Sequence, residues 1–188
     1  LLCRRCTASC PSGVPTDDIV MAARQYLVEK GRYPYLKRVI VRGVLGRPGN
    51  RVPLLGAAPL AQLLFFGSGA GDFHRARVPL PEPLRHVPAL PGGTFRDRMP
   101  QIIPPTTSRG RGRAAYFTGC FTNLVDHRVG RSVVEVMTGA GLGVEIPAGQ
   151  GCCGLPALAA GDVERGLGML AATVRTLAGS PADAVVVD

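Results

Sequence analysis

The chain has 188 residues and a formal net charge of +9, with 46% hydrophobic and 19% charged residues. This length suffices for one ordinary domain or two small ones, and the composition excludes a disordered chain. No run of about 18 apolar residues and no secretory leader is evident, so we expect neither a spanning helix nor secretion, and cysteines in a reducing compartment.

The first half of the chain predicts helices followed by a proline-rich segment. A helix should begin at Pro15 and end at Gly31, because acidic residues occupy its first turn and apolar residues repeat at helical spacing. An Arg-rich helix is expected over 35–45 and an apolar one over 53–66, which is too short to cross a bilayer and is expected in the interior. Residues 78–105 contain 8 prolines and no apolar period, which predicts an extended connector.

Beyond the connector, strands and helices alternate. Strands are expected over 114–117, 144–146 and 184–187, with helices over 126–138 and 162–178 between them. This alternation predicts a parallel α/β layer.

Glycine-rich stretches at 67–71 and 139–143 each follow a predicted helix rather than a strand, so we interpret them as caps and turns and not as nucleotide-binding loops. The three histidines, His74, His86 and His127, are isolated in sequence from one another and from the cysteines. We expect each to be a surface or packing residue.

Positive charge is concentrated in the first part of the chain. Residues 1–113 hold 18 basic and 6 acidic side chains, whereas residues 114–188 hold 4 and 7. Such a basic part suits an acidic protein partner, anionic lipid or anionic groups within the protein. We expect no nucleic-acid partner, because the chain shows no reading motif and the Arg-Gly run at 109–113 is too short to be one.

The six cysteines form two groups of three. The groups consist of Cys3, Cys6 and Cys10, and of Cys120, Cys152 and Cys153. A disulfide between the two adjacent cysteines of the second group would be strained, and a reducing compartment disfavours bridges. Buried structural thiols are a second alternative. The grouping favours metal ligation.

The first group matches an iron–sulfur motif. Cys3-x2-Cys6-x3-Cys10-Pro11 is the later part of the bacterial ferredoxin run, whose additional cysteine would fall directly before Leu1. In a complete run Cys3 and Cys6 bind one [4Fe–4S] cluster and Cys10 binds a second. Zinc is the competing metal, but the spacing and the following proline favour iron–sulfur.

The second group resembles a known family. Tyr116–Cys120 and, after 31 intervening residues, Cys152-Cys153-Gly154-Leu155-Pro156 resemble the cysteine-rich CCG domain. That domain occurs in heterodisulfide reductases, the glycolate oxidase iron–sulfur subunit, the C subunit of anaerobic glycerol-3-phosphate dehydrogenase and lactate-utilisation proteins. The resemblance implies that Cys120, Cys152 and Cys153 ligate an iron–sulfur cluster or a zinc ion. A further C-x2-C pair of the family would lie beyond Asp188, so we expect the chain to be a fragment.

These observations predict an α+β or α/β protein with four parts. Residues 1–31 are expected to be the C-terminal part of a helical ferredoxin-type 4Fe-4S module, 32–77 a helical connector, 78–112 a proline-rich linker and 113–188 the N-terminal part of an α/β CCG domain.

The resemblance implies an electron-transfer subunit of a respiratory-type dehydrogenase of the glycolate, lactate or glycerol-3-phosphate class. It would carry electrons from a flavin-containing partner subunit toward a quinone or another acceptor, in the cytoplasm or at the inner membrane face beside a membrane subunit. Substrate oxidation would then take place on another chain. Two alternatives remain open: a heterodisulfide-reductase-like catalytic subunit whose CCG-bound cluster is the redox centre, and a structural zinc scaffold.

Overall fold

The computed structural model describes residues 3–32, 43, 60, 62, 64–68, 73–77, 86–108 and 110–188. The chain forms two compact units, each built from separate stretches of sequence. The first unit contains Leu1–Pro48 and Gly151–Arg175, and the second contains Gly49–Gln150 and Thr176–Asp188. Helices and mixed sheets are both present, which confirms the predicted fold class.

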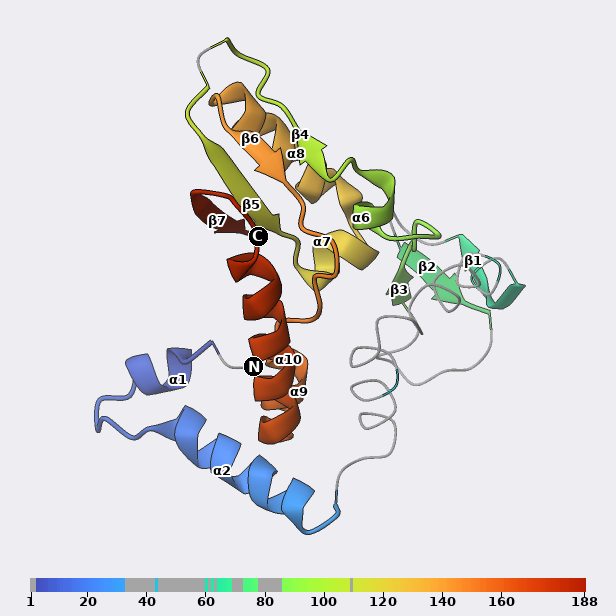
Figure 1. The fold of residues 1–188 in the computed structure, drawn as a ribbon. Helices are drawn as coiled ribbons and strands as arrows, with labels where there is room; N and C mark the ends of the chain where they lie inside the picture. The colour runs from blue at the N-terminus through green and yellow to red at the C-terminus, as the bar shows by residue number, and fades with distance from the viewer. Residues whose placement is uncertain are drawn as a thin grey trace. The chain divides into compact units, whose positions relative to one another are not determined.

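The first unit is helical (Figure 1). It contains α1 (Arg5–Ala8), α2 (Thr16–Glu29), α9 (Leu155–Ala159) and α10 (Val163–Ala178), the last of which continues past the boundary of the unit. Helices α2 and α10 confirm two of the predicted helices. The guanidinium of Arg24 in α2 donates a hydrogen bond of 2.6 Å to the carbonyl oxygen of Ala159 at the end of α9.

A contact between two glycines brings α9 and α10 together. Gly154, which precedes α9, has a φ of +83°, a conformation that L side chains rarely adopt. A Cβ built on it would lie 2.1 Å from the carbonyl oxygen of Gly166 in α10. Only glycine therefore fits after the cysteine pair at this point of the chain.

The second unit contains a four-stranded sheet in the order β4–β6–β5–β7. The strands are β4 (Ile102–Ile103), β5 (Arg113–Phe117), β6 (Gly143–Glu145) and β7 (Ala184–Val187). Strand β5 pairs in parallel with both β6 and β7, whereas β4 is an antiparallel edge strand. The three predicted strands thus form a parallel layer, as expected.

Helix α8 (His127–Gly139) packs on one face of this sheet (Figure 1). It begins at Asp126, whose carboxylate accepts a hydrogen bond from the backbone N–H of Arg128 at 3.0 Å. The core between helix and sheet consists of Phe95, Ala114, Tyr116, Val134, Met137, Val144 and Ile146. After α8, the chain turns at Gly141 (φ +88°) into β6, which confirms that the second glycine-rich stretch is a turn.

The described part of the proline-rich segment is folded. It contains β3 (His86–Pro88), α6 (Phe95–Arg98) and β4, and Phe95 is 1% exposed in the core. The prediction of an extended connector is therefore wrong from His86 onward, because prolines at the boundaries of short elements leave their interiors free to form regular structure. Residues 78–85 lie outside the described part.

A second, antiparallel sheet has the order β1–β2–β3, with β1 over Phe66–Ser68 and β2 over Phe73–Ala76. Phe66 therefore begins a strand rather than ending the predicted helix over 53–66, most of which lies outside the described residues, as does the helix predicted over 35–45. Within the residues that the structure describes, no helix has the length and apolar character needed to cross a membrane.

Candidate metal centre

The six cysteines are all free thiols. Cys152 is buried, Cys10 and Cys153 are half-buried, and the other three are exposed. Thiolate sulfur is the ligand that iron–sulfur clusters take, and it also suits zinc. By the chemistry of its donors, this set of residues fits a thiolate-bound metal group.

The first group of cysteines lies around helix α1. Cys6 is in α1, and Cys10 follows it in a turn where its Sγ accepts a hydrogen bond from the backbone N–H of Val14 at 3.4 Å. Hydrogen bonds from backbone N–H groups to sulfur stabilise negative charge on the sulfur and influence cluster potentials. The local backbone therefore fixes the position of the Cys10 sulfur.

One carboxylate connects this cysteine segment to α2. Asp17, in the first turn of α2, accepts hydrogen bonds from the Thr7 hydroxyl and from Nε of Arg4, the latter at 2.8 Å. The Thr7 hydroxyl and then the Arg4 guanidinium hold the pKa of Asp17 below its usual value. The carboxylate is therefore ionised at neutral pH and fixes the segment between Cys3 and Cys10 against the start of α2.

Cys120 lies where strand β5 ends. The strand stops at Phe117, and Cys120 is the first residue of the short helix α7 (Cys120–Leu124). The carboxylate of Asp188, directly after β7, accepts a hydrogen bond from the backbone N–H of Gly119 at 2.5 Å. In parallel α/β sheets the carboxyl ends of the strands form the usual ligand site. Cys120 thus lies at the carboxyl end of a parallel strand, where such sites occur.

The polar side chain of Gln150 binds the end of β5. Its Nε2 donates to the carbonyl oxygen of Tyr116 at 2.8 Å, and its Oε1 accepts from the backbone N–H of Thr118 at 3.2 Å. Both Gln150 and Thr118 are buried. These bonds attach the segment after β6 to the carboxyl end of β5, within the second unit.

Cys152 and Cys153 lie in the loop between β6 and α9. The Thr173 hydroxyl of α10 donates a hydrogen bond of 3.1 Å to the carbonyl oxygen of Cys152. A Cβ on Gly151 would lie 3.2 Å from the same hydroxyl oxygen, so a small residue allows the close contact. The loop that bears the cysteine pair is therefore fixed to α10 by its backbone.

Burial controls the ionisation of two side chains in the second unit. Desolvation, reinforced by the Asp188 carboxylate, raises the pKa of Tyr116 far above its usual value. Desolvation also lowers the pKa of His127, whose Nε2 lies 3.1 Å from the carbonyl oxygen of Asn123. Both side chains are therefore neutral at neutral pH, and His127 is a packing residue, as predicted.

The structure does not gather the predicted ligands into a completed centre. Among the described residues, no three Cys, His, Asp or Glu side chains lie close enough to hold a metal ion. Cys120 belongs to the second unit, whereas Cys152 and Cys153 belong to the first. That either group of three shares one centre therefore stays a prediction.

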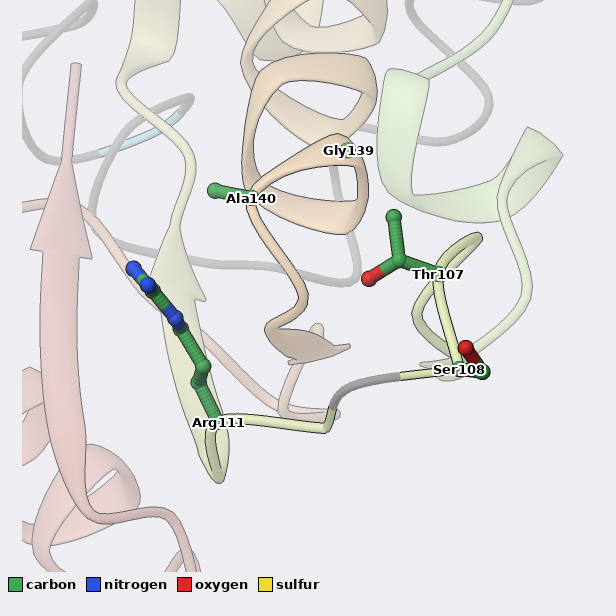
Figure 2. Close-up of a pocket in the computed structure, with 5 residues that line it drawn as sticks. All are labelled: Thr107, Ser108, Arg111, Gly139 and Ala140. Atoms are coloured by element: carbon green, nitrogen blue, oxygen red, sulfur yellow. The ribbon is translucent and has the colours of Figure 1, made fainter.

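A pocket in the second unit lies apart from these residues. Figure 2 shows it between the loop after β4 and the end of α8. Its lining residues are Thr107, Ser108, Arg111, Gly139 and Ala140. No cysteine lines this pocket, so it is not the predicted metal centre.

A parallel α/β layer with one cysteine at a strand end and a cysteine pair in a later loop defines a cysteine-rich α/β domain. Residues 114–188 match the family model described as "Cysteine-rich domain", CCG. This match confirms the resemblance that the cysteine motifs predicted. No solved structure matches the chain.

Several curated proteins are similar to the chain. The C subunit of anaerobic glycerol-3-phosphate dehydrogenase from Escherichia coli (strain K12) is 30% identical over 81 residues, 43% of this chain and 20% of that protein. The probable glycolate oxidase iron–sulfur subunit of Bacillus subtilis (strain 168) is 26% identical over 163 residues, 81% of this chain and 36% of that protein. A lactate utilization protein A 2 of Bacillus cereus is 41% identical over 52 residues, 28% of this chain and 22% of that protein. The chain thus spans between a fifth and about a third of these relatives.

Sequence reasoning identified the cysteines but missed the residues that support them. Asp17 signals only a helix start in the sequence, and Gln150 and Thr173 carry no motif. A signal for α6 was present in the proline-rich segment, because Thr94 and Asp97 have the spacing of a helix N-cap. The Thr94 hydroxyl accepts a hydrogen bond from the Asp97 N–H at 3.2 Å.

Proposed function

We propose that this chain is part of an iron–sulfur electron-transfer subunit of a dehydrogenase of the glycolate, lactate or glycerol-3-phosphate class. It takes electrons from a flavin-containing partner subunit and passes them toward a quinone or another acceptor. The CCG domain at residues 114–188 supports this proposal most directly. Relatives are named as subunits of a glycerol-3-phosphate dehydrogenase and of a glycolate oxidase, the latter as its iron–sulfur subunit.

Each group of cysteines has its own role in this proposal. Cys3, Cys6 and Cys10 hold ferredoxin-type [4Fe–4S] clusters, and Cys120, Cys152 and Cys153 hold an iron–sulfur cluster, with zinc as the alternative metal at this second centre. A bound cluster supplies one-electron redox chemistry. Free thiols in both groups support the assignment.

The protein contributes fixed ligand geometry and a local charge. The Val14 N–H donates a hydrogen bond to the Cys10 sulfur, and the ionised Asp17 holds that segment against α2. In the second unit, Gln150 binds the Tyr116 carbonyl oxygen in β5 and the N–H of Thr118, two residues before Cys120. Such outer contacts orient metal ligands, and losing them typically costs about 10- to 100-fold in metal affinity or activity.

The charge distribution supports docking to an anionic partner. Arginines and lysines outnumber acidic residues threefold in residues 1–113, and thiolate-bound clusters are themselves anionic. The basic part of the chain therefore suits an acidic surface on the dehydrogenase subunit or an anionic membrane face. We place the protein in the cytoplasm, with docking at the inner membrane face as part of the same proposal.

The test is the metal content of the full-length protein, purified without oxygen. Iron, sulfide and zinc per chain, together with the visible absorption spectrum, are measured for the wild type and for Cys6→Ser and Cys120→Ser. We expect iron and sulfide in the wild type, and a loss of iron in each variant, because serine is a poor ligand for a cluster. Ser12→Ala, in the same segment as Cys6, is the matched control and should retain its iron.

Two results would contradict the proposal. Unchanged iron in both cysteine variants would mean that neither group binds a cluster. Stoichiometric zinc with no iron or sulfide would establish the structural zinc scaffold instead. Electron transfer is then tested by reduction of the loaded protein with the purified flavin subunit and its substrate, and reduction at the rate of free flavin alone would exclude the proposed partnership.

A further inference from the structure

One arginine of the second unit binds the backbone shortly before both cysteine-bearing segments of the CCG domain. The guanidinium of Arg96 donates from Nη1 to the carbonyl oxygen of Gln150 at 2.6 Å and from Nη2 to the carbonyl oxygen of Thr118 at 2.5 Å. Its Nε donates to the Thr118 hydroxyl. Thr118 lies two residues before Cys120, and Gln150 lies two residues before Cys152. One side chain therefore connects the two segments that lead to the cysteines.

The fold holds Arg96 firmly at this place. Helix α6 begins at the N-cap Thr94, and its buried Phe95 packs edge-on against Tyr116 of β5 with ring centroids 6.4 Å apart. The backbone N–H of Arg96 itself donates to Oδ1 of Asn123 in α7 at 3.2 Å. The side chain thus extends from a fixed helix toward the carboxyl end of β5.

The chemistry of the side chain suits this role. A guanidinium is planar, permanently charged and carries five N–H donors in a fork, so it can bind two carbonyl oxygens and a hydroxyl together. Two residues of chain span at most about 7 Å, so fixing Thr118 and Gln150 narrows the region that Cys120 and Cys152 can reach. A lysine ammonium keeps the charge but lacks the planar fork.

We propose that Arg96 is a positioning residue for the second metal centre, which fixes the backbone at Thr118 and Gln150 that leads to Cys120 and Cys152. This inference rests on the proposed function. The charge of Arg96 has a second consequence, because a thiolate-bound cluster gains one negative charge on one-electron reduction. A nearby guanidinium favours that reduced state and therefore raises the reduction potential.

The experiment compares Arg96→Met and Arg96→Lys in the full-length protein, reconstituted with iron and sulfide without oxygen. Iron per chain, the electron paramagnetic resonance signal and the midpoint potential of the second centre are measured. Arg98→Met is the matched control, because Arg98 lies on the same helix but is exposed and donates to the carbonyl oxygen of Pro91. Circular dichroism of the metal-free variants confirms that each one folds.

We expect Arg96→Met to lose about 10- to 100-fold in metal affinity at this centre and to lower the potential of the fraction that remains loaded. Arg96→Lys should lose similar affinity but keep a potential near the wild-type value. If Arg96→Met binds the metal and keeps its midpoint potential as the wild type and Arg98→Met do, the inference is overturned, although the second centre still exists. Unchanged iron in Cys120→Ser would instead overturn the centre, and the inference with it.

Discussion

The side-chain amide of Gln150 forms the backbone hydrogen bonds to Tyr116 and Thr118 that a neighbouring strand would otherwise supply. It accepts from the Thr118 N–H at 3.2 Å and donates to the carbonyl oxygen of Tyr116 at 2.8 Å, so one amide satisfies a buried donor and a buried acceptor at the end of β5. Backbone groups left unpaired in a protein interior are costly. A glutamine two residues before a cysteine pair is therefore a structural requirement of this strand end.

We predict that Gln150→Glu destabilises the protein by about 1–3 kcal/mol, because a carboxylate cannot donate to the Tyr116 carbonyl oxygen and leaves it unpaired. Urea unfolding of the metal-free protein measures the effect. Gln101→Glu is the control, since Gln101 is exposed, and it should change the free energy of unfolding by less than about 0.5 kcal/mol. Equal effects of the two substitutions would show that the amide bonds of Gln150 contribute nothing.

The contact between Gly154 and Gly166 leads to a second prediction. Gly154→Ala should destabilise the first unit by about 2–4 kcal/mol, because alanine is strained at a φ of +83° and its Cβ would overlap the Gly166 carbonyl oxygen. Thermal unfolding measures the loss. In Gly168→Ala, on the same helix α10, the new Cβ has open space, so that variant should be about 0.5–1 kcal/mol more stable. A neutral Gly154→Ala would contradict the close approach.

The strands and helices of the CCG-like region could be predicted because apolar periodicity is set by residues close together in the sequence. The alternation of strands and helices over 113–188 follows from apolar periodicity, and the structure confirms it from β5 to β7. Helix α6 escaped prediction, since four residues show no period and prolines surround them. Phe95 belongs to the core only because β5 and α8 pack around it.

The candidate site likewise has a part that the sequence shows and a part that only the folded chain shows. Cysteine spacing is a property of the sequence, and by itself it indicates all six proposed ligands. The supporting contacts are long-range: Arg96 lies 22 residues from Thr118 and 54 from Gln150. No pattern within a short window encodes such a pairing, so only the folded chain reveals it.

A third prediction concerns the packing of α8. Gly130 of α8 meets Phe95 so closely that a Cβ would lie 2.7 Å from the ring and 2.9 Å from a methyl carbon of Thr122. Gly130→Ala should therefore cost about 1–3 kcal/mol through overpacking, measured by urea unfolding. Gly139→Ala, at the end of the same helix, meets no atom within 4 Å and should not destabilise the protein. If both variants were equally stable, Phe95 could not lie against Gly130.

A fourth prediction tests the attachment of the first cysteine segment to α2. Asp17→Asn removes the charged acceptor of the Thr7 and Arg4 hydrogen bonds while keeping the side-chain volume. Amide hydrogen exchange of residues 3–14, followed by mass spectrometry, should become faster than in the wild type. Asp18→Asn alters an exposed neighbour and should leave the exchange unchanged. Unaltered exchange in Asp17→Asn would mean that the carboxylate does not hold the segment.

The last prediction concerns pH and rests on His127. This side chain is 7% exposed, and its ring packs edge-on against Phe95 with centroids 5.9 Å apart. Burial lowers its pKa below the usual value of 6.5, as do the charges of Arg98 and Arg131, whereas the Asn123 carbonyl oxygen and Asp126 act in the opposite direction. The folded state therefore binds a proton less readily than the unfolded state.

The sign of the pH dependence follows from this difference. The contribution of neutral His127 to stability is complete above the unfolded pKa of 6.5 and decreases as the pH falls below it, because the unfolded state then binds more protons. Urea unfolding at intervals between about pH 5 and 8 should show this decrease in the wild type. His127→Gln should have a smaller slope over that range, because the variant lacks the imidazole whose pKa is lowered by folding. Identical slopes would show that His127 has the same proton affinity in the folded and unfolded chains.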